Sequence, residues 1–304
     1  MNTTPANKKI LSRNAKKNIF LAAMLIVPVV HFIIFWGYVN FSSILMAFQG
    51  VNPAEGKIYW TLNNFKTVFT MFGKFGQLKT ALGNTLLTWA FLTVFLMPWS
   101  FLLTYFLYKK IRLSGLWRTA LFVPTLLPAI AMTSIFTYIL YADAPVGKLI
   151  GLVFKTVPAF LVDEKYAKWS VIIYMFLTNF GGSFILISGA MARVPREIIE
   201  SAYIDGAGMR VELTRILLPL CWPTLSTLLI LNTAGIFMAT GPVLLLTWGE
   251  AKTSTISFWI FNQVFKFQQY YMPAALGLLC TVILFPAVLL VRWGLGKVWA
   301  DVEF

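Results

Sequence analysis

The sequence predicts an all-α, polytopic membrane protein with six transmembrane helices, and three observations predict it. The 304-residue chain is 59% hydrophobic and 12% charged, whereas a soluble domain is about one quarter charged. Its apolar residues gather in six runs, each of about 20 residues or more, which is the length that a helix needs to cross the hydrocarbon of a bilayer. The Lys and Arg residues lie between these runs or at their ends.

Each apolar run is predicted to be one span. The first run lacks a small-x-small cleavage pattern, which favours an uncleaved helix over a signal peptide. The predicted spans cover residues 19–41, 81–107, 117–141, 168–191, 217–247 and 272–293. The chain then divides into a basic N-terminal tail (1–18), a first helix with an extracellular segment (19–79), a membrane core (80–296) and a C-terminal tail (297–304).

The positive charges orient these helices. All eight arginines, and 15 of the 25 basic residues, lie on one side of the six spans. In membrane proteins that side is the cytoplasm. Both termini and the loop near residue 200 are therefore expected in the cytoplasm, where the basic tail would be attracted to anionic membrane lipid. The segments 42–80 and 142–167 are expected outside the cell as ordered loops with short helices.

Composition and spacing argue against several functions. The basic residues form no continuous stripe, so no nucleic-acid binding is predicted. Cys221 and Cys280 stand alone in separate apolar runs, which gives neither a disulfide framework nor a metal spacing. His31, the only histidine, has no Cys, Asp or Glu nearby. No Gly-x-x-x-x-Gly-Lys-Ser/Thr loop occurs, so no cofactor is expected on this chain and no enzyme site is predicted.

The acidic residues bear on how transport would be driven. All eleven lie outside the centres of the predicted spans. Ion-coupled carriers tend to hold carboxylates at membrane depth, so their absence weakens that interpretation. It stays open, because carbonyl and hydroxyl oxygens at broken helices can also hold sodium. Any nucleotide energy would have to come from a partner.

A polar segment between the fourth and fifth spans predicts two short helices joined by a glycine turn. Pro195 suits a first helical turn, and Glu200 is favourable near a helix N-terminus. Gly206 or Gly208 can end the first helix with a positive φ. The small residues that follow Glu200 would let another surface approach closely. Composition alone leaves open whether this segment docks a partner or lies on the membrane surface.

The same segment resembles the EAA signature of the permeases of binding-protein-dependent ABC importers. Serine replaces the usual alanine at position 201, which is a small-for-small change. The resemblance runs from about residue 20 to the C-terminus and is nearest to the MalF-like or UgpA-like subunit of the carbohydrate uptake group. The residues that carry it are Glu200-Ser201-Ala202, Asp205-Gly206-Ala207, Ile216 and Leu218-Pro219.

This resemblance implies a type I ABC importer permease fold, in which 195–219 is a cytoplasmic coupling loop. It implies a subunit of an ATP-driven importer for a sugar, oligosaccharide or glycoside in the bacterial plasma membrane. The implied partners are a second, homologous permease chain, two ATPase domains that bind ATP and Mg, and an extracytoplasmic solute-binding protein. A permease for another solute, such as glycerol phosphate, and an ion-coupled carrier remain alternatives.

The resemblance also implies which residues of the loop contact the ATPase. Glu200 is expected to be a charged anchor, and Ala202 and Gly206 to be positions of close approach. Asp205 is expected to cap the turn or to make a polar contact there. The complete predicted coupling set is Glu200, Ser201, Ala202, Asp205, Gly206 and Ala207.

Polar side chains in the fourth and fifth spans are candidates for the solute path, because sugars are held by hydrogen-bonding groups and aromatic faces. Hydrogen bonding between helices would explain the same residues. The pair Gly181-Gly182 predicts close packing of helices, and Gly241-Pro242 predicts a broken helix. The path candidates are Tyr174, Asn179, Ser183, Asn232 and Thr233.

Overall fold

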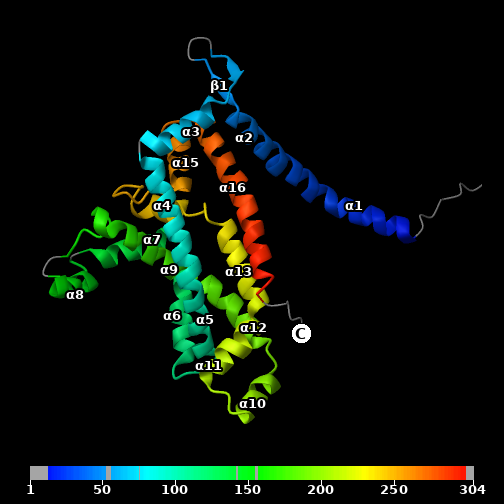
Figure 1. Cartoon of the computed structure of the whole chain (residues 1–304), viewed down its shortest axis with the longest axis vertical. Helices are drawn as coiled ribbons and strands as arrows, with labels where there is room; N and C mark the ends of the chain where they lie inside the picture. The colour runs from blue at the N-terminus through cyan, green and yellow to red at the C-terminus, as the bar shows by residue number, and fades with distance from the viewer. Residues whose placement is uncertain (1–12, 53–55, 75, 142, 155–156, 299–304) are drawn as a thin grey trace, which may run out of the picture.

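The computed structural model describes residues 13–52, 56–74, 76–141, 143–154 and 157–298. Most of the predicted N-terminal tail and the last six residues of the C-terminal tail lie outside this part of the chain. The described helices form an elongated bundle, with a β-hairpin at one end and α10 (Arg196–Ile204) at the other (Figure 1).

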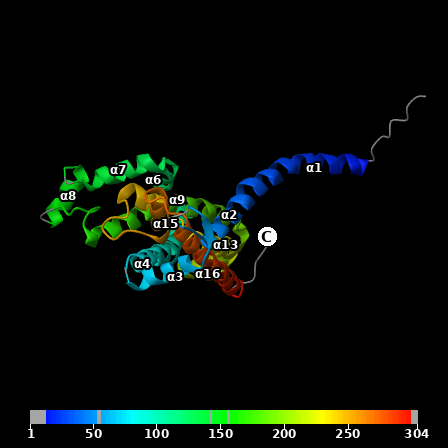
Figure 2. The same cartoon turned by 90° about the horizontal axis from the view of Figure 1, so that it is seen from above.

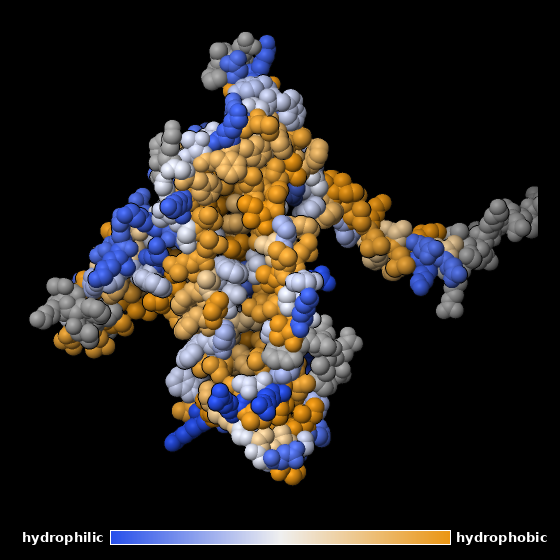
Figure 3. Space-filling model, in the orientation of Figure 1, coloured by the Kyte–Doolittle hydropathy of each residue, from blue (hydrophilic) through white to orange (hydrophobic). Residues whose placement is uncertain are grey.

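Helices make up the membrane-spanning part of the molecule. The described residues contain four continuous helical stretches and two bent pairs that are long and apolar enough to cross a membrane, which confirms six spans if each bent pair is one span. Figure 3 shows a broad hydrophobic surface, with hydrophilic residues gathered near β1 and near α10. The continuous stretches are Asn14–Ala47, Gln77–Tyr108, Glu164–Ala192 and Tyr271–Leu295; the bent pairs are Ser114–Leu126 with Ala129–Leu140 and Met209–Leu220 with Trp222–Ala234.

The first span is longer than the predicted 19–41. Its polar side chains are accommodated by hydrogen bonds to its own backbone: Asn40 Nδ2 donates to the Trp36 carbonyl (2.7 Å) and Ser43 Oγ to the Val39 carbonyl (2.9 Å). Its C-terminal part packs along α16 (Tyr271–Leu295). Its N-terminal part extends away from the bundle (Figures 1 and 2). The elements are α1 (Arg13–His31), π-helical η1 (Phe32–Tyr38) and α2 (Val39–Ala47).

A short hairpin follows the first span, where loops and short helices were expected. The side-chain amide of Asn64 holds it against the helix end by donating to the carbonyls of Ala47 (3.0 Å) and Gln49 (2.8 Å). Strands of three residues are too short to show a clear alternation of polar and apolar residues. The elements are antiparallel β1 (Gln49–Val51) and β2 (Ile58–Trp60), followed by α3 (Asn63–Lys74).

The third predicted span is bent by 112° and is not one straight helix. Leu127 is extended, with φ −73° and ψ 141°. Pro128, which follows, lacks an N–H and disfavours a helical conformation at the preceding residue. The second span, this bent pair and the fourth span consist of α4 (Gln77–Ala90), η2 (Phe91–Leu96), α5 (Met97–Tyr108), α6 (Ser114–Leu126), α7 (Ala129–Leu140), the short α8 (Pro145–Phe154) and α9 (Glu164–Ala192).

The prediction of one span over 217–247 was wrong in its bounds. The helix begins earlier, bends by 69° and ends at Ala234, where Gly235 is the C-cap. The break therefore lies before Gly241-Pro242, which sit in the first turn of α14, where proline is well tolerated. The elements are α11 (Met209–Val211), η3 (Glu212–Leu217), α12 (Leu218–Leu220), α13 (Trp222–Ala234), α14 (Thr240–Leu246) and α15 (Ile256–Phe265).

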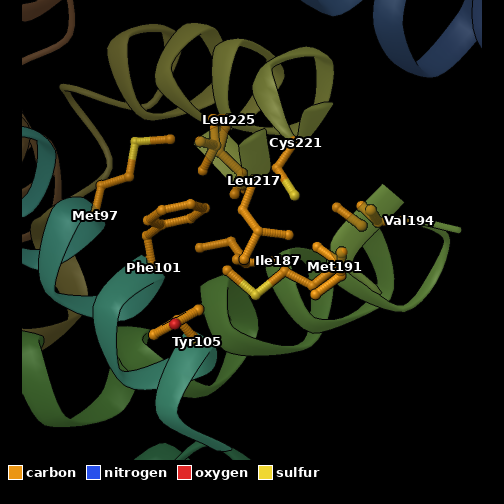
Figure 4. Close-up of a cluster of buried hydrophobic side chains, with 12 residues drawn as sticks. Met97, Phe101, Tyr105, Ile187, Met191, Val194, Leu217, Cys221 and Leu225 are labelled. Carbon is orange, nitrogen blue, oxygen red and sulfur yellow. The ribbon is translucent and has the colours of Figure 1, made fainter. Parts of the chain in front are cut away.

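Two packing features fix how the helices of the bundle meet. Figure 4 shows an apolar core in which side chains from α5, α9 and the fifth span point toward one another, among them Phe101, Met191 and Leu217. Where α6 meets α9, a Cβ on Gly181 would lie 2.2 Å from Thr125 Oγ1, so the predicted close packing at Gly181 is confirmed. The neighbouring Gly182 has nothing within 4 Å of such a Cβ.

Candidate coupling loop and transport path

The coupling loop begins with a helix whose end is defined by hydrogen bonds. Helix α10 follows Pro195 and has Asp205 as its C-cap. The Ala207 N–H donates to the Ala202 carbonyl (2.8 Å), and the Gly206 N–H donates to the Tyr203 carbonyl (3.0 Å). This is the bonding pattern of a Schellman motif. Its left-handed residue is Gly206, with φ +79°, so the predicted glycine turn is confirmed at Gly206.

One face of α10 packs on the bundle and the other is open. Ile199 is buried in the apolar core, whereas Glu200, Ser201, Asp205 and Gly206 are exposed. Ala202 and Ala207 are half-buried. Among the described residues, the Asp205 carboxylate has no hydrogen bond, and its capping contact is made by its backbone N–H to the Ser201 carbonyl.

The open face also carries an apolar side chain that was not among the predicted coupling residues. Ile204 is 87% exposed. It lies four residues after Glu200, the predicted charged anchor, and therefore on the same face of α10. In the sequence, its position directly before Asp205-Gly206 was the available signal.

Glu212, counted from sequence among the acids of a polar loop, is instead buried at the start of η3. It forms an ion pair with Lys109 at the end of the second span. Its partners come from distant parts of the chain, so spacing could not reveal this contact.

Two of the predicted path residues share a cavity of about 320 Å³. Asn179 lies midway along α9, and Asn232 lies near the end of α13. The amide nitrogen of Asn179 donates to the Met175 carbonyl (2.8 Å). No charged side chain of the described residues lines this cavity.

The second span adds polar groups to this cavity that sequence reasoning missed. Trp89 and Thr93 both line it. The Trp89 indole nitrogen and the Thr93 hydroxyl are buried without a hydrogen-bond partner among the described residues. Their spacing of four residues, which puts them on one helix face, was the signal in the sequence.

The other three path candidates lie elsewhere. The Tyr174 hydroxyl is 2.9 Å from Thr133 Oγ1, between α9 and α7, and Tyr174 lines a neighbouring cavity of about 240 Å³. The Thr233 hydroxyl donates to the Leu229 carbonyl of its own helix (2.8 Å). Ser183 is half-buried and lines neither cavity. The structure thus brings together Asn179 and Asn232.

The chain is similar to known transport permeases over most of its length. MsmF, a multiple sugar-binding transport system permease protein of Streptococcus mutans, is 26% identical over 87% of this chain and 90% of its own length. AraP, an arabinooligosaccharides transport system permease protein of Bacillus subtilis, is 24% identical over 84% of this chain and 82% of its own.

The fold has a close match among solved structures. A chain of a bacterial ABC transporter involved in the import of alginate superposes with a TM-score of 0.82 at 22% identity, covering 94% of this chain and 98% of that one. This confirms the type I importer permease fold. Residues 97–296 match the family described as "Binding-protein-dependent transport system inner membrane component". The match covers well over half of the sequence, so the chain belongs to this family of transport permeases.

Proposed function

We propose that this chain is the membrane-spanning permease subunit of an ATP-driven importer for a sugar, oligosaccharide or glycoside. The observation that carries the proposal is the family match across the coupling loop and across α9 and α13, two of the helices that line the Asn179 cavity. The names of MsmF and AraP support a saccharide cargo.

The chemistry of the cavity favours a neutral sugar over glycerol phosphate. Asn179, Asn232 and Thr93 offer neutral hydrogen-bonding groups, and Trp89 adds an aromatic surface. A phosphate would be expected to meet Arg, Lys or converging N–H donors. The lining residues among the described part of the chain include no Arg or Lys.

The importer needs partners that this chain does not contain. A crystal structure of the alginate transporter holds a periplasmic protein bound to an alginate pentasaccharide, which supports a solute-binding protein here. ATP and Mg would bind to two ATPase domains in partner chains. The exposed apolar surface of the first span, which has no buried residue before Ala47, fits lipid or a second, homologous permease. We place the complex in the bacterial plasma membrane with both termini in the cytoplasm.

The coupling loop gives a physical route from ATPase to cavity. Closure of the ATPase would displace the open face of α10, which carries Glu200 and Ile204. Ile199 belongs to the same apolar core as Ile187 of α9 and Leu225 of α13, and these two helices line the cavity. Displacement of α10 can therefore bias the arrangement of both helices, which is what coupling between two sites requires.

Co-purification tests the assembly. An affinity tag on this chain should recover an ATPase and a second permease from the native membrane, and the binding protein should bind oligosaccharides in a ligand screen. Transport by the chain alone, driven by an ion gradient in vesicles, would overturn the proposal in favour of a carrier. A binding protein that selects glycerol phosphate would overturn the saccharide assignment and leave the importer assignment standing.

A further inference from the structure

Four polar side chains meet where the second span, α10 and the fifth span come together. Glu212 Oε2 accepts hydrogen bonds from the hydroxyls of Tyr203 (2.8 Å) and Tyr105 (3.0 Å). Glu212 Oε1 lies 2.5 Å from Lys109 Nζ. Lys109 also hydrogen-bonds to the Tyr203 hydroxyl. We call these residues the Lys109–Glu212 cluster.

The carboxylate at the centre of the cluster is buried. The Glu212 side chain is 2% exposed and that of Lys109 is 27% exposed. A carboxylate removed from water is unfavourable unless it is paired and hydrogen-bonded. Oε1 has no polar partner other than Lys109 among the described residues. Loss of Lys109 would therefore leave a buried charge without its counterion.

The surroundings of Lys109 favour its charged form. Burial opposes its charge, but the hydrogen bonds to Glu212 and Tyr203 outweigh burial, and the pKa of Lys109 is raised above its ordinary value. Its Nζ also lies 4.7 Å from the centroid of the Tyr203 ring, within the range of a cation–π interaction. The ion pair and this ring contact both hold the Lys109 ammonium beside α10.

Tyr203 gives the cluster its link to the coupling helix. Within the described part of the chain, Tyr203 is the one residue of α10 whose side chain makes hydrogen bonds to residues outside this helix. Its two partners lie on different spans: Lys109 caps α5, and Glu212 begins η3. One side chain of α10 is therefore bonded to the ends of two membrane helices.

We propose that Lys109 and Glu212 are positioning residues that make α10 move together with the ends of the second and fifth spans. The inference rests on the proposed function and specifies how the coupling loop transmits motion within it. Without the bonds of Tyr203 to this pair, α10 is held by apolar contacts such as that of Ile199 and by the chain connection. When the ATPase displaces α10, the ends of the second and fifth spans then no longer move with it. Less sugar is therefore imported for each ATP hydrolysed.

The test uses the complete transporter in liposomes, with its ATPase, second permease and binding protein. The measured quantity is sugar imported per ATP hydrolysed. For Glu212→Gln we expect this ratio to fall about tenfold, within the usual range of coupling effects between sites, while ATP hydrolysis continues. Tyr203→Phe should also lower the ratio, because it removes the hydroxyl through which α10 is bonded to Lys109 and Glu212.

Matched controls lie beside the cluster. Lys110 is exposed and Tyr108 is half-buried, and neither makes a side-chain hydrogen bond or ion pair among the described residues. Lys110→Met and Tyr108→Phe should therefore leave the ratio unchanged. If Glu212→Gln fails to assemble, the comparison of Tyr203→Phe with Tyr108→Phe still decides the question, and equal ratios for this pair would overturn the proposal.

A double variant separates positioning from simple stability. Lys109→Met with Glu212→Gln removes both charges, so its thermal stability should recover toward that of the wild type relative to Lys109→Met alone. A positioning role predicts that the transport ratio stays low in the double variant. Recovery of the ratio together with stability would contradict it. A wild-type complex without ATP-dependent import would instead refute the proposed function.

Discussion

At the scale of single residues, the end of α10 depends on a backbone conformation that glycine adopts freely. Gly206 has φ +79°, and a Cβ built on it meets nothing within 4 Å. The left-handed conformation costs an L-residue roughly 1–2 kcal/mol. A side chain at this position would therefore strain the backbone and project into space where a partner is expected to approach.

Gly206→Val should leave membrane insertion intact and uncouple ATP hydrolysis from uptake. Its matched control is Gly208→Ala, because Gly208 has φ −78° and open space at its Cβ. Insertion is measured by the amount of chain in the membrane fraction, and coupling by uptake per ATP in liposomes. Normal uptake by Gly206→Val would remove the docking assignment.

The two asparagines of the cavity give a second prediction at this scale. Asn179→Ala and Asn232→Ala should each weaken the apparent affinity of transport by about tenfold, the effect of losing a hydrogen bond worth ~1–1.5 kcal/mol. The measurement is the substrate dependence of uptake, with Ser183→Ala as the control outside the cavity. Unchanged substrate dependence in both asparagine variants would exclude them from the path.

The candidate site was only partly predictable from single residues. Asn179 and Asn232 were chosen as candidates because sugars are held by hydrogen-bonding side chains. Trp89 and Thr93 were missed, since Trp is common at membrane interfaces and Thr is common in membrane helices. The burial of Glu212 could not be predicted, because it depends on Lys109 and Tyr105, which precede it by more than 100 residues.

At the scale of elements, bends and close contacts decide how the helices fit together. Hydropathy predicted where the helices lie but not the 112° bend between α6 and α7. The hydropathy of an apolar run is the same whether the helix it forms is straight or bent. Pro128 was the local signal for that bend. The contact of α6 with α9 depends on Gly181, which sequence did predict as a packing position.

Gly181→Ala should destabilise the bundle, because its Cβ would lie 2.2 Å from Thr125 Oγ1 and 2.9 Å from Thr125 Cβ. Overpacking of this kind costs about 1–3 kcal/mol. Gly182→Ala is the matched control, since its Cβ meets nothing within 4 Å and alanine favours the helix. Thermal unfolding in detergent compares the two, and equal midpoints would contradict the packing described here.

At the scale of the whole molecule, charge and hydropathy predict the architecture better than they predict local detail. Six spans followed from six apolar runs because the bilayer imposes a minimum helix length. The hairpin of β1 and β2 and the separation of α14 from α13 could not be predicted this way, since they involve short segments whose geometry depends on neighbours. The orientation rests on the arginines, which lie together on one side.

Cysteine labelling tests this orientation. Ile58 in β2 is 62% exposed and Ile204 in α10 is 87% exposed. A cysteine at either position should therefore react with a membrane-impermeant maleimide that is added on its own side of the membrane. Ile58→Cys should be labelled in intact cells or spheroplasts, and Ile204→Cys only after the membrane is opened. The reverse pattern would show that the coupling loop faces outward and cannot meet a cytoplasmic ATPase.

Uptake of a labelled oligosaccharide by liposomes that contain the complete complex tests the proposed importer most directly. A permease coupled through α10 gives uptake that requires the binding protein outside and ATP on the ATPase side, and that Gly206→Val abolishes while hydrolysis continues. Uptake that persists without ATP and follows an ion gradient would contradict the proposed function.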